Sequence, residues 1–215
     1  MSDFPEEPIY QQLARIGKAL ASPVRLRLLD VLDQRERTVE ELAQAAGVAL
    51  KNTSAQLQQL RAAHLVTSRK EGSRVYYRVA DDRVSRFLGE LHGFAHDRLA
   101  DLRDAVRERL ASPEGVTAHE LAARLSHAGT LVVDVRSPAD YAAGHVPGAI
   151  SLPLAELRDR LDELPKEAEI IAYCGGPYCA VSAEAVRVLG EHGYTARTLD
   201  GGYLGWRRAD QPAGG

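Results

Sequence analysis

The chain has 215 residues, of which 45% are hydrophobic, and a formal net charge of −3 at pH 7, so it can form the cores of two small domains. No segment approaches the roughly 18 apolar residues of a membrane-spanning helix, and the N-terminus lacks a signal-peptide pattern. We therefore expect a cytoplasmic protein with no membrane partner.

Charge is unevenly distributed along the chain. Residues 1–111 carry a net charge of +2 and residues 112–215 a net charge of −5. Residues 51–78 contain six Lys and Arg residues and one Glu, which gives a local charge of +5. A basic island in an acidic chain indicates contact with a polyanion, although charge alone also fits a solvated surface.

The first third of the chain has the pattern of short helices. Residues 5–20 show helical apolar spacing, and Ser22 followed by proline is a typical helix start. Thr38 and Glu41 form a capping box that begins a short helix ending at Gly47. Another helix follows at once, and two short helices joined by a tight glycine turn predict a helix-turn-helix.

The second helix of this pair begins with small polar residues, as a recognition helix requires. Asn and Gln side chains can pair with adenine edges, and Ser, Thr and Lys can contact phosphates or bases. The candidate DNA contacts on this helix are Lys51, Asn52, Thr53, Ser54, Gln56 and Arg61.

Residues 66–79 alternate across a glycine turn and predict a β-hairpin with a basic tip. Its candidate phosphate contacts are Arg69, Lys70 and Arg74. Each polar residue taken singly is more typical of an ordinary surface than of a DNA contact. Together, the helix pair, the hairpin and the local charge predict DNA binding.

These segments resemble the ArsR family of winged-helix repressors. The matching residues are 22–29, 54–60, 64–66 and 72–77. The resemblance implies a mainly α-helical winged helix-turn-helix that binds an inverted repeat in double-stranded DNA as a homodimer. Residues 81–110 are expected to form one long amphipathic helix, which in the family builds the dimer interface with the first helix.

The metal-binding residues of many ArsR proteins are missing. Residues 38–44, where the family places cysteine ligands, contain neither Cys nor His. His92 and His96 are four residues apart, with Asp97 beside them, but the spacing does not match the family's D-x-H…H-x-x-[HE] site. We expect surface or interface histidines, with no metal and no cofactor.

A domain boundary is predicted at residues 111–115, where Pro113 and Gly115 interrupt a helical pattern. The predicted domains are therefore residues 1–111 and 112–215. Both cysteines of the chain, Cys174 and Cys179, lie in the second domain. In a reducing compartment, two cysteines this close are typical of reactive thiols, not of a structural disulfide framework.

The two cysteines lie in a loop between a short apolar strand and a helical segment. Backbone amides and the helix dipole are expected to lower the pKa of Cys174 and to form an anion cradle. The residues of this cradle are Gly175, Gly176, Pro177, Tyr178 and Ala180. Cys179 is close enough to attack a persulfide or sulfenic acid on Cys174. Two buried, inert cysteines are the alternative.

The loop contains no Lys or Arg, which limits the reactions that it can support. A cysteine phosphatase or arsenate-reductase loop has the pattern C-x5-R, with an arginine that clamps the oxyanion. Here the sixth residue after Cys174 is Ala180. Sulfur chemistry remains, in which a thiolate accepts sulfane sulfur and becomes a persulfide.

The loop resembles the active-site loop of the rhodanese, or sulfurtransferase, family. Two further motifs of that family match, at residues 132–150 with the pattern D-x-R…GH-V-PGA and at residues 201–206. The resemblance implies an α/β domain with a mostly parallel sheet and Cys174 as the sulfur acceptor. Many rhodaneses have Arg or Lys in the loop, and their absence here argues against efficient use of thiosulfate.

Three other residues of these motifs have expected supporting roles. Asp134 and Arg136 are expected to form a structural ion pair or to brace the loop, and His145 to shape a glycine-containing turn. We predict a sequence-specific DNA-binding regulator, most simply a repressor, whose second domain senses or transfers sulfane sulfur from polysulfide or thiosulfate. The alternatives are a sulfurtransferase that uses the winged helix as a dimeriser or locator, and a general dithiol redox switch.

Overall fold

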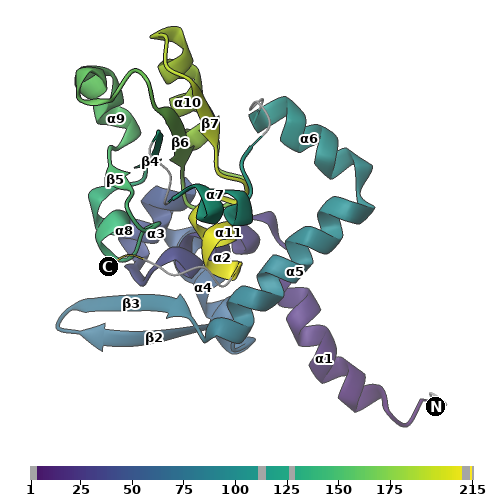
Figure 1. Cartoon of the computed structure of the whole chain (residues 1–215). Helices are drawn as coiled ribbons and strands as arrows, with labels where there is room; N and C mark the ends of the chain where they lie inside the picture. The colour runs from purple at the N-terminus through teal and green to yellow at the C-terminus, as the bar shows by residue number, and fades with distance from the viewer. Residues whose placement is uncertain (1–3, 111–114, 126–128, 210–213, 215) are drawn as a thin grey trace. The chain divides into compact units, whose positions relative to one another are not determined.

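The computed structural model describes residues 4–110, 115–125, 129–209 and 214 (Figure 1). Its contacts divide the chain into two units, Met1–Ser85 and Arg86–Gly215, which are described separately below. Most of the predicted boundary at 111–115 lies outside the described residues, so the boundary stays a prediction.

Two of the four helices in the first part of the chain begin at side-chain caps. The four helices are α1 (Glu7–Leu20), α2 (Pro23–Gln34), α3 (Val39–Ala46) and α4 (Leu50–Ala62). The Ser22 hydroxyl accepts from the amide of Arg25, and Thr38 and Glu41 form the reciprocal bonds of a capping box. Gly47 ends α3 with φ +67°, a conformation that favours glycine. The predicted helix-turn-helix is confirmed.

The same unit contains a three-stranded antiparallel sheet in the order β1-β3-β2. The strands are β1 (Arg37–Thr38), β2 (Val66–Glu71) and β3 (Arg74–Val79). Figure 1 shows β2 and β3 as a long, narrow hairpin, whose turn contains Gly72 at φ +58°. Leucines from three helices form the core: Leu28, Leu29, Leu32, Leu42, Leu57 and Leu60. This arrangement is a winged helix-turn-helix.

The predicted single helix over residues 81–110 is wrong, because it is divided at Leu99. The chain forms α5 (Asp82–Arg98), which begins in the first unit, and α6 (Ala100–Leu110), with a sharp bend between them in Figure 1. Arg103 donates to the carbonyl oxygens of His96 at 2.8 Å and Asp97 at 3.0 Å. A side chain thus occupies carbonyls at the end of α5, which marks the break. Among the described helices, none has the length and apolar character needed to cross a membrane.

The second unit is built on a four-stranded sheet in the order β5-β4-β6-β7, with every pair parallel. The strands are β4 (Thr130–Asp134), β5 (Ile150–Ser151), β6 (Glu169–Tyr173) and β7 (Ala196–Thr198). Asp134 and Tyr173 are opposite one another at the carboxyl ends of the two central strands. The predicted α/β class with a parallel sheet is confirmed.

Helices cover both faces of this sheet. They include α9 (Leu154–Leu157), η1 (Arg158–Glu163) and α10 (Val181–Glu191) on one face, and α7 (Ala118–Arg124), α8 (Pro138–Ala142) and α11 (Gly202–Arg208) on the other. Side chains alternate along β6, so Ala172 and Cys174 enter the first core, and Ile171 and Tyr173 enter the second. The sulfur of Cys174 and the ring of Tyr173 therefore lie on opposite faces.

Candidate functional site

Cys174 is the first residue after β6, at the edge of the sheet where ligands bind in open parallel folds. The loop that follows is fastened to α11, because the Cys174 carbonyl accepts from the Tyr203 amide at 2.8 Å and the Gly175 carbonyl from the Leu204 amide at 3.1 Å. A Cβ atom on Gly202, whose φ is +58°, would lie 2.5 Å from the Cys174 carbonyl oxygen. The glycine motif before α11 therefore permits this close approach.

The Cys174 sulfur is buried and lies among polar groups of Cys179 and Ser182. Its thiol donates to the Cys179 carbonyl oxygen, with 3.4 Å between sulfur and oxygen. The Ser182 hydroxyl, in the first turn of α10, lies 3.3 Å from the same sulfur. Because the single thiol proton is directed at the carbonyl, the Ser182 hydroxyl is the donor in the second contact.

The expected lowering of the thiol pKa is wrong for this arrangement. Hydrogen bonding to the Cys179 side chain, burial, and the charge of that side chain raise the pKa of Cys174 well above its usual value. The hydroxyl and backbone amide of Ser182 oppose this shift because they stabilise the thiolate. These effects favour the thiol form of Cys174, and the described residues contain no disulfide bond.

The anion cradle also differs from the prediction. Pro177 has no N–H group, so it can shape the turn but cannot donate. The Cys179 amide donates to the Gly176 carbonyl at 3.2 Å. Any cradle must therefore use the amides of Gly175, Gly176, Tyr178 or Ala180 with the start of α10. A cavity of about 350 Å³ beside the loop, with Gly176, Cys179 and Ser182 in its lining, leaves room for a small sulfur donor.

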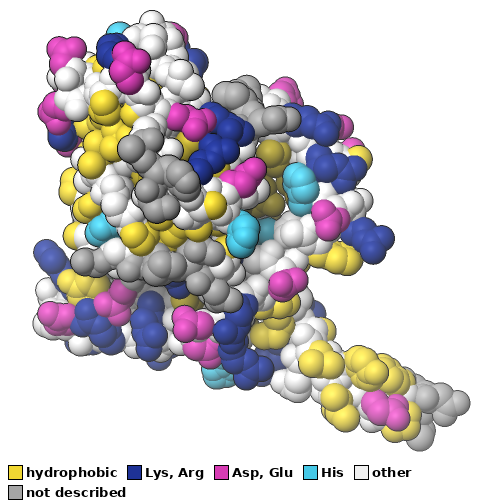
Figure 2. Space-filling view, viewed as in Figure 1, with side chains coloured by type: hydrophobic (Ala, Val, Ile, Leu, Met, Phe, Trp, Pro, Cys, Tyr) yellow, Lys and Arg dark blue, Asp and Glu magenta, His cyan; other side chains and the backbone are white. Residues whose placement is uncertain are grey.

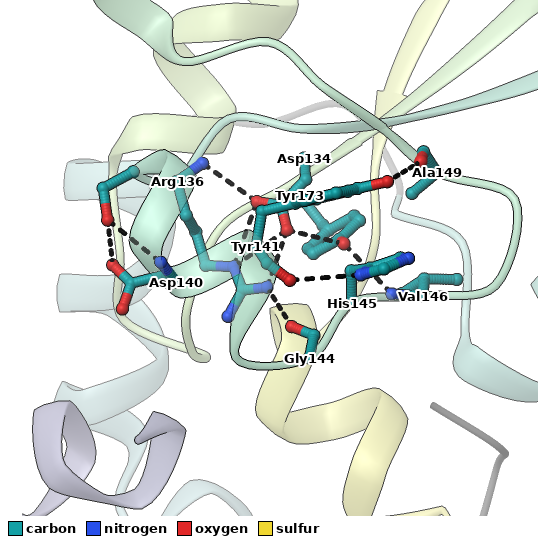
Figure 3. A network of polar contacts seen from close by, with 10 residues as sticks. Asp134, Arg136, Asp140, Tyr141, Gly144, His145, Val146, Ala149 and Tyr173 are labelled. Atoms are coloured by element: carbon teal, nitrogen blue, oxygen red, sulfur yellow. Dashed lines mark hydrogen bonds and ion pairs between the residues drawn. The ribbon is translucent and has the colours of Figure 1, made fainter. Parts of the chain in front are cut away.

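Asp134 and Arg136 form a buried polar network on the other face of the sheet (Figure 3). The Arg136 guanidinium donates to Asp134 Oδ2 at 2.6 Å and to the Gly144 carbonyl at 2.7 Å, and lies 4.2 Å from the centre of the Tyr203 ring. The Tyr173 hydroxyl donates to Asp134 at 2.7 Å. This geometry supports the bracing role of the pair, because the arginine lies away from the sulfur.

His145 has the position expected of a turn-shaping residue. Its Nδ1 lies 3.1 Å from the Tyr141 carbonyl oxygen, and its ring stacks on Tyr141 with 3.9 Å between ring centres (Figure 3). These contacts lie within the loop that carries the Gly144 carbonyl bound by Arg136. The histidine therefore stabilises the same network.

In the first unit, the structure separates the predicted DNA contacts into exposed and buried residues. The exposed ones are Lys51, Asn52, Ser54, Arg61, Arg69, Lys70 and Arg74, and Gln56 is half-buried. Thr53 is fully buried, and its hydroxyl donates to the carbonyls of Val48 at 3.4 Å and Ala49 at 3.2 Å. The prediction that Thr53 contacts DNA is therefore wrong, because its side chain faces the core and the turn before α4.

Arg69 and Gln56 are already engaged within the protein. Arg69 donates to Glu36 at 2.6 Å, contacts Glu71, and lies 4.6 Å from the centre of the Tyr76 ring. Gln56 is half-buried and accepts from Arg25 at 2.8 Å. Arg69 is consequently a weaker phosphate contact than the sequence indicated, since its charge is offset by two carboxylates.

Comparison with known proteins covers both units. A helix-turn-helix domain family matches residues 20–69, and the rhodanese-like domain family matches residues 117–209. The HTH-type transcriptional regulator Rv0324 of Mycobacterium tuberculosis is 45% identical over 95% of this chain and 91% of its own length. The chain belongs to the ArsR-type transcriptional regulators that carry a rhodanese-like domain.

Two other similarities each concern one part of this regulator. A sulfurtransferase of Allochromatium vinosum is 36% identical over 38% of the chain and 76% of its own length. The homodimeric winged helix-turn-helix DNA-binding domain Mb0332 of Mycobacterium bovis, known from its solution structure, is 42% identical. The match covers 47% of this chain and 93% of that domain, with a TM-score of 0.43.

Two residues of the regulator's sites escaped the sequence analysis. Ser182 lies eight residues after Cys174 and contacts its sulfur, and the phase of the helix after the loop is the signal that could have indicated it. Tyr173 precedes the cysteine and anchors Asp134. Strand alternation places Tyr173 on the opposite face, but its partner comes from another strand, which no local pattern reveals.

Proposed function

We propose that this regulator binds an inverted repeat in double-stranded DNA as a homodimer and that sulfane sulfur on Cys174 changes its affinity for DNA. The observation that carries the proposal is the placement of Cys174. Its thiol lies at the carboxyl edge of a parallel sheet, beside Cys179 and under the first turn of α10. All thiols of the chain belong to this domain, so a thiol-borne signal must enter there.

The DNA-binding part of the proposal rests on exposed groups of one helix and one hairpin. Lys51, Asn52 and Ser54 are exposed at the start of α4, and Lys70 and Arg74 near the tip of the hairpin. The N-terminal residues of a recognition helix contact base edges, and cations of a wing contact phosphates.

The dimer is proposed from exposed apolar side chains. Ile9 and Leu13 of α1 are each 63% exposed, and so is Phe94 of α5. Figure 2 shows hydrophobic side chains gathered along the outer half of α1. Exposed apolar surface of this kind marks a contact with another chain, and a second copy matches the two-fold symmetry of an inverted repeat.

The sulfur chemistry needs no oxidant beyond the donor. Cys174 loses its proton, and its thiolate attacks a sulfane sulfur of a polysulfide. A sulfur–sulfur bond forms on Cys174, one in the donor breaks, and the shortened polysulfide leaves with the electron pair. The Cys179 thiolate can then attack Sγ of the Cys174 persulfide. This step forms a disulfide between the two cysteines and releases the outer sulfur as hydrosulfide.

The resting loop opposes this reaction until its geometry changes. The Cys179 carbonyl oxygen faces the sulfur and would repel a thiolate or a persulfide anion. The Cys179 carbonyl and the Ala180 amide belong to one peptide plane, so a rotation that removes the carbonyl brings the N–H group toward the sulfur. Loading with sulfur would thereby rearrange the loop, which is the change that a sensor requires.

The test uses full-length protein and a duplex selected by this protein from a random DNA library. Affinity is measured with and without polysulfide, for the wild type and for Cys174→Ser, and mass spectrometry records the sulfur added to each cysteine. Polysulfide should alter the affinity of the wild type and leave Cys174→Ser unchanged. Identical affinity in all four measurements, with Cys174 loaded, would refute the coupling.

Two further measurements separate the alternatives. Rapid thiocyanate formation from cyanide, with unaltered DNA affinity, would identify a sulfurtransferase. Hydrogen peroxide that acts as well as polysulfide would identify a general dithiol switch, which the contact between Cys174 and Cys179 favours as the second candidate.

A further inference from the structure

A side-chain relay connects the end of α1 to the exposed start of α4. Arg25 of α2 donates through Nε to the Ala19 carbonyl at 2.5 Å and through Nη2 to the Lys18 carbonyl at 2.7 Å. Its remaining nitrogen, Nη1, donates to Gln56 Oε1 at 2.8 Å. Arg25 is therefore held by α1 while it binds a side chain of the recognition helix.

The chemistry of arginine fixes the orientation of each amide in this relay. A guanidinium has donors and no acceptor, so the oxygen of Gln56 must face Arg25. The amide nitrogen of Gln56 is then the atom that contacts the next residue, and it donates to Asn52 Oδ1 at 3.0 Å. Asn52 must in turn direct its oxygen toward Gln56, which leaves its Nδ2 donors for a ligand.

We propose that Asn52 reads DNA as a hydrogen-bond donor and that Arg25 and Gln56 set this specificity. The inference rests on the proposed DNA-binding function. Asn52 is exposed in the first turn of α4, where a recognition helix meets base edges. In the major groove its donors suit guanine, which presents the two acceptors N7 and O6, or thymine O4, whereas adenine presents N7 as its one acceptor. A bidentate contact with adenine also needs the oxygen, which is turned toward Gln56 and has one of its two lone pairs engaged there.

The inference corrects the expectation that Asn52 and Gln56 pair with adenine. An asparagine or glutamine free to rotate can present both its donor and its acceptor to adenine N7 and N6. Here the oxygen of each amide already accepts from a neighbour in the chain, which fixes the orientation of the amide and engages one of the two lone pairs of that oxygen. The relay thus restricts base choice through residues that need not touch DNA.

Glutamate at position 56 provides a sharp test, because it retains an acceptor for Arg25 and has no donor for Asn52. In Gln56→Glu, Asn52 should turn its amide, donate to the glutamate and present its oxygen to DNA. Selection from a random duplex library with full-length protein should then show a changed base preference at one position of each half-site. Guanine or thymine should give way to adenine or cytosine by about fivefold, the effect of one hydrogen bond.

Two controls separate orientation from charge. Gln59→Glu adds the same charge at an exposed position of the same helix, and should weaken binding without a change in base preference. Asn52→Ala should abolish the preference at that position, and the double variant Asn52→Ala with Gln56→Glu should match it. Circular dichroism and thermal unfolding confirm that each variant is folded.

Three results would overturn the inference. The first is a wild-type preference for adenine that Asn52→Ala removes. The second is a base preference that Gln56→Glu leaves unchanged. The third is a base preference that Asn52→Ala leaves unchanged, which would indicate that Asn52 binds phosphate only. Failure of the wild-type protein to enrich any duplex is a separate outcome, because it would reject the DNA-binding function itself.

Discussion

The buried pair of Asp134 and Arg136 yields a quantitative prediction about the stability of the rhodanese-like domain. Asp134 is fully buried and accepts from the Arg136 amide, the Arg136 guanidinium and the Tyr173 hydroxyl. In Asp134→Ala the guanidinium would stay buried with its counter-charge removed. Removing one partner of a buried pair costs about 3–5 kcal/mol, and we expect a loss of about 4 kcal/mol.

A double variant tests whether this loss comes from the Arg136 charge, which stays buried without its carboxylate partner. In Asp134→Ala with Arg136→Met, both charges are gone and an apolar chain of similar length can pack against Tyr173 and Tyr203. Replacing a buried pair with apolar residues is often close to neutral, so the double variant should be more stable than Asp134→Ala by about 2 kcal/mol. The ordering of these two variants is the informative result.

Trp206 allows the measurement to be made in the full-length chain. It is the only tryptophan, it is fully buried, and it shares a core with Tyr173 and Tyr203. Urea unfolding followed by its fluorescence therefore reports on this domain. Glu163→Ala, which removes an exposed partner of Arg160, is the control and should leave the midpoint near that of the wild type. An Asp134→Ala loss below about 1 kcal/mol, or a double variant less stable than the single one, would refute the reasoning.

Three further predictions follow from individual contacts. Cys179→Ala keeps the backbone carbonyl but removes the side chain whose hydrogen bond and charge raise the pKa of Cys174. Iodoacetamide should therefore alkylate Cys174 faster at pH 7, and the half-maximal pH of alkylation should fall. An unchanged pH profile, resolved by mass spectrometry, would contradict this. Thr53→Val should cost about 1 kcal/mol in unfolding free energy and leave the salt dependence of DNA binding unchanged, whereas Lys51→Ala should reduce the salt slope by about 1. Gly202→Ala places a methyl group against the Cys174 carbonyl at a positive φ, and should cost more than about 1 kcal/mol by Trp206 fluorescence.

Much of the fold was predictable because its signals are local. The capping box of Thr38 and Glu41, the Ser22 cap and the Gly47 ending each involve residues within a few positions of one another. The same holds for the hairpin turn at Gly72. Interactions of such short range are encoded in the residue types themselves, so these helix ends and this turn could be placed before any tertiary contact was known.

The break between α5 and α6 had no comparable signal. The sequence around Leu99 contains neither proline nor glycine, and its apolar spacing continues through the bend. The structure places the Arg103 side chain on two carbonyls at the end of α5. Which acceptor a long, flexible side chain finds depends on the three-dimensional surroundings, and periodicity carries no information about it.

The sequence by itself determined which residues this regulator has for its chemistry: two cysteines in a glycine loop after a strand, and a polar start to a recognition helix. Only the tertiary structure decided the pKa, the net local charge and the orientation of these side chains. The Cys179 side chain and burial raise the pKa of Cys174, Glu36 from 33 positions earlier offsets the charge of Arg69, and Arg25 orients Gln56. Protonation, exposure and amide orientation are set by groups that distant segments bring into contact, because electrostatic and hydrogen-bonding environments are properties of space and not of chain order.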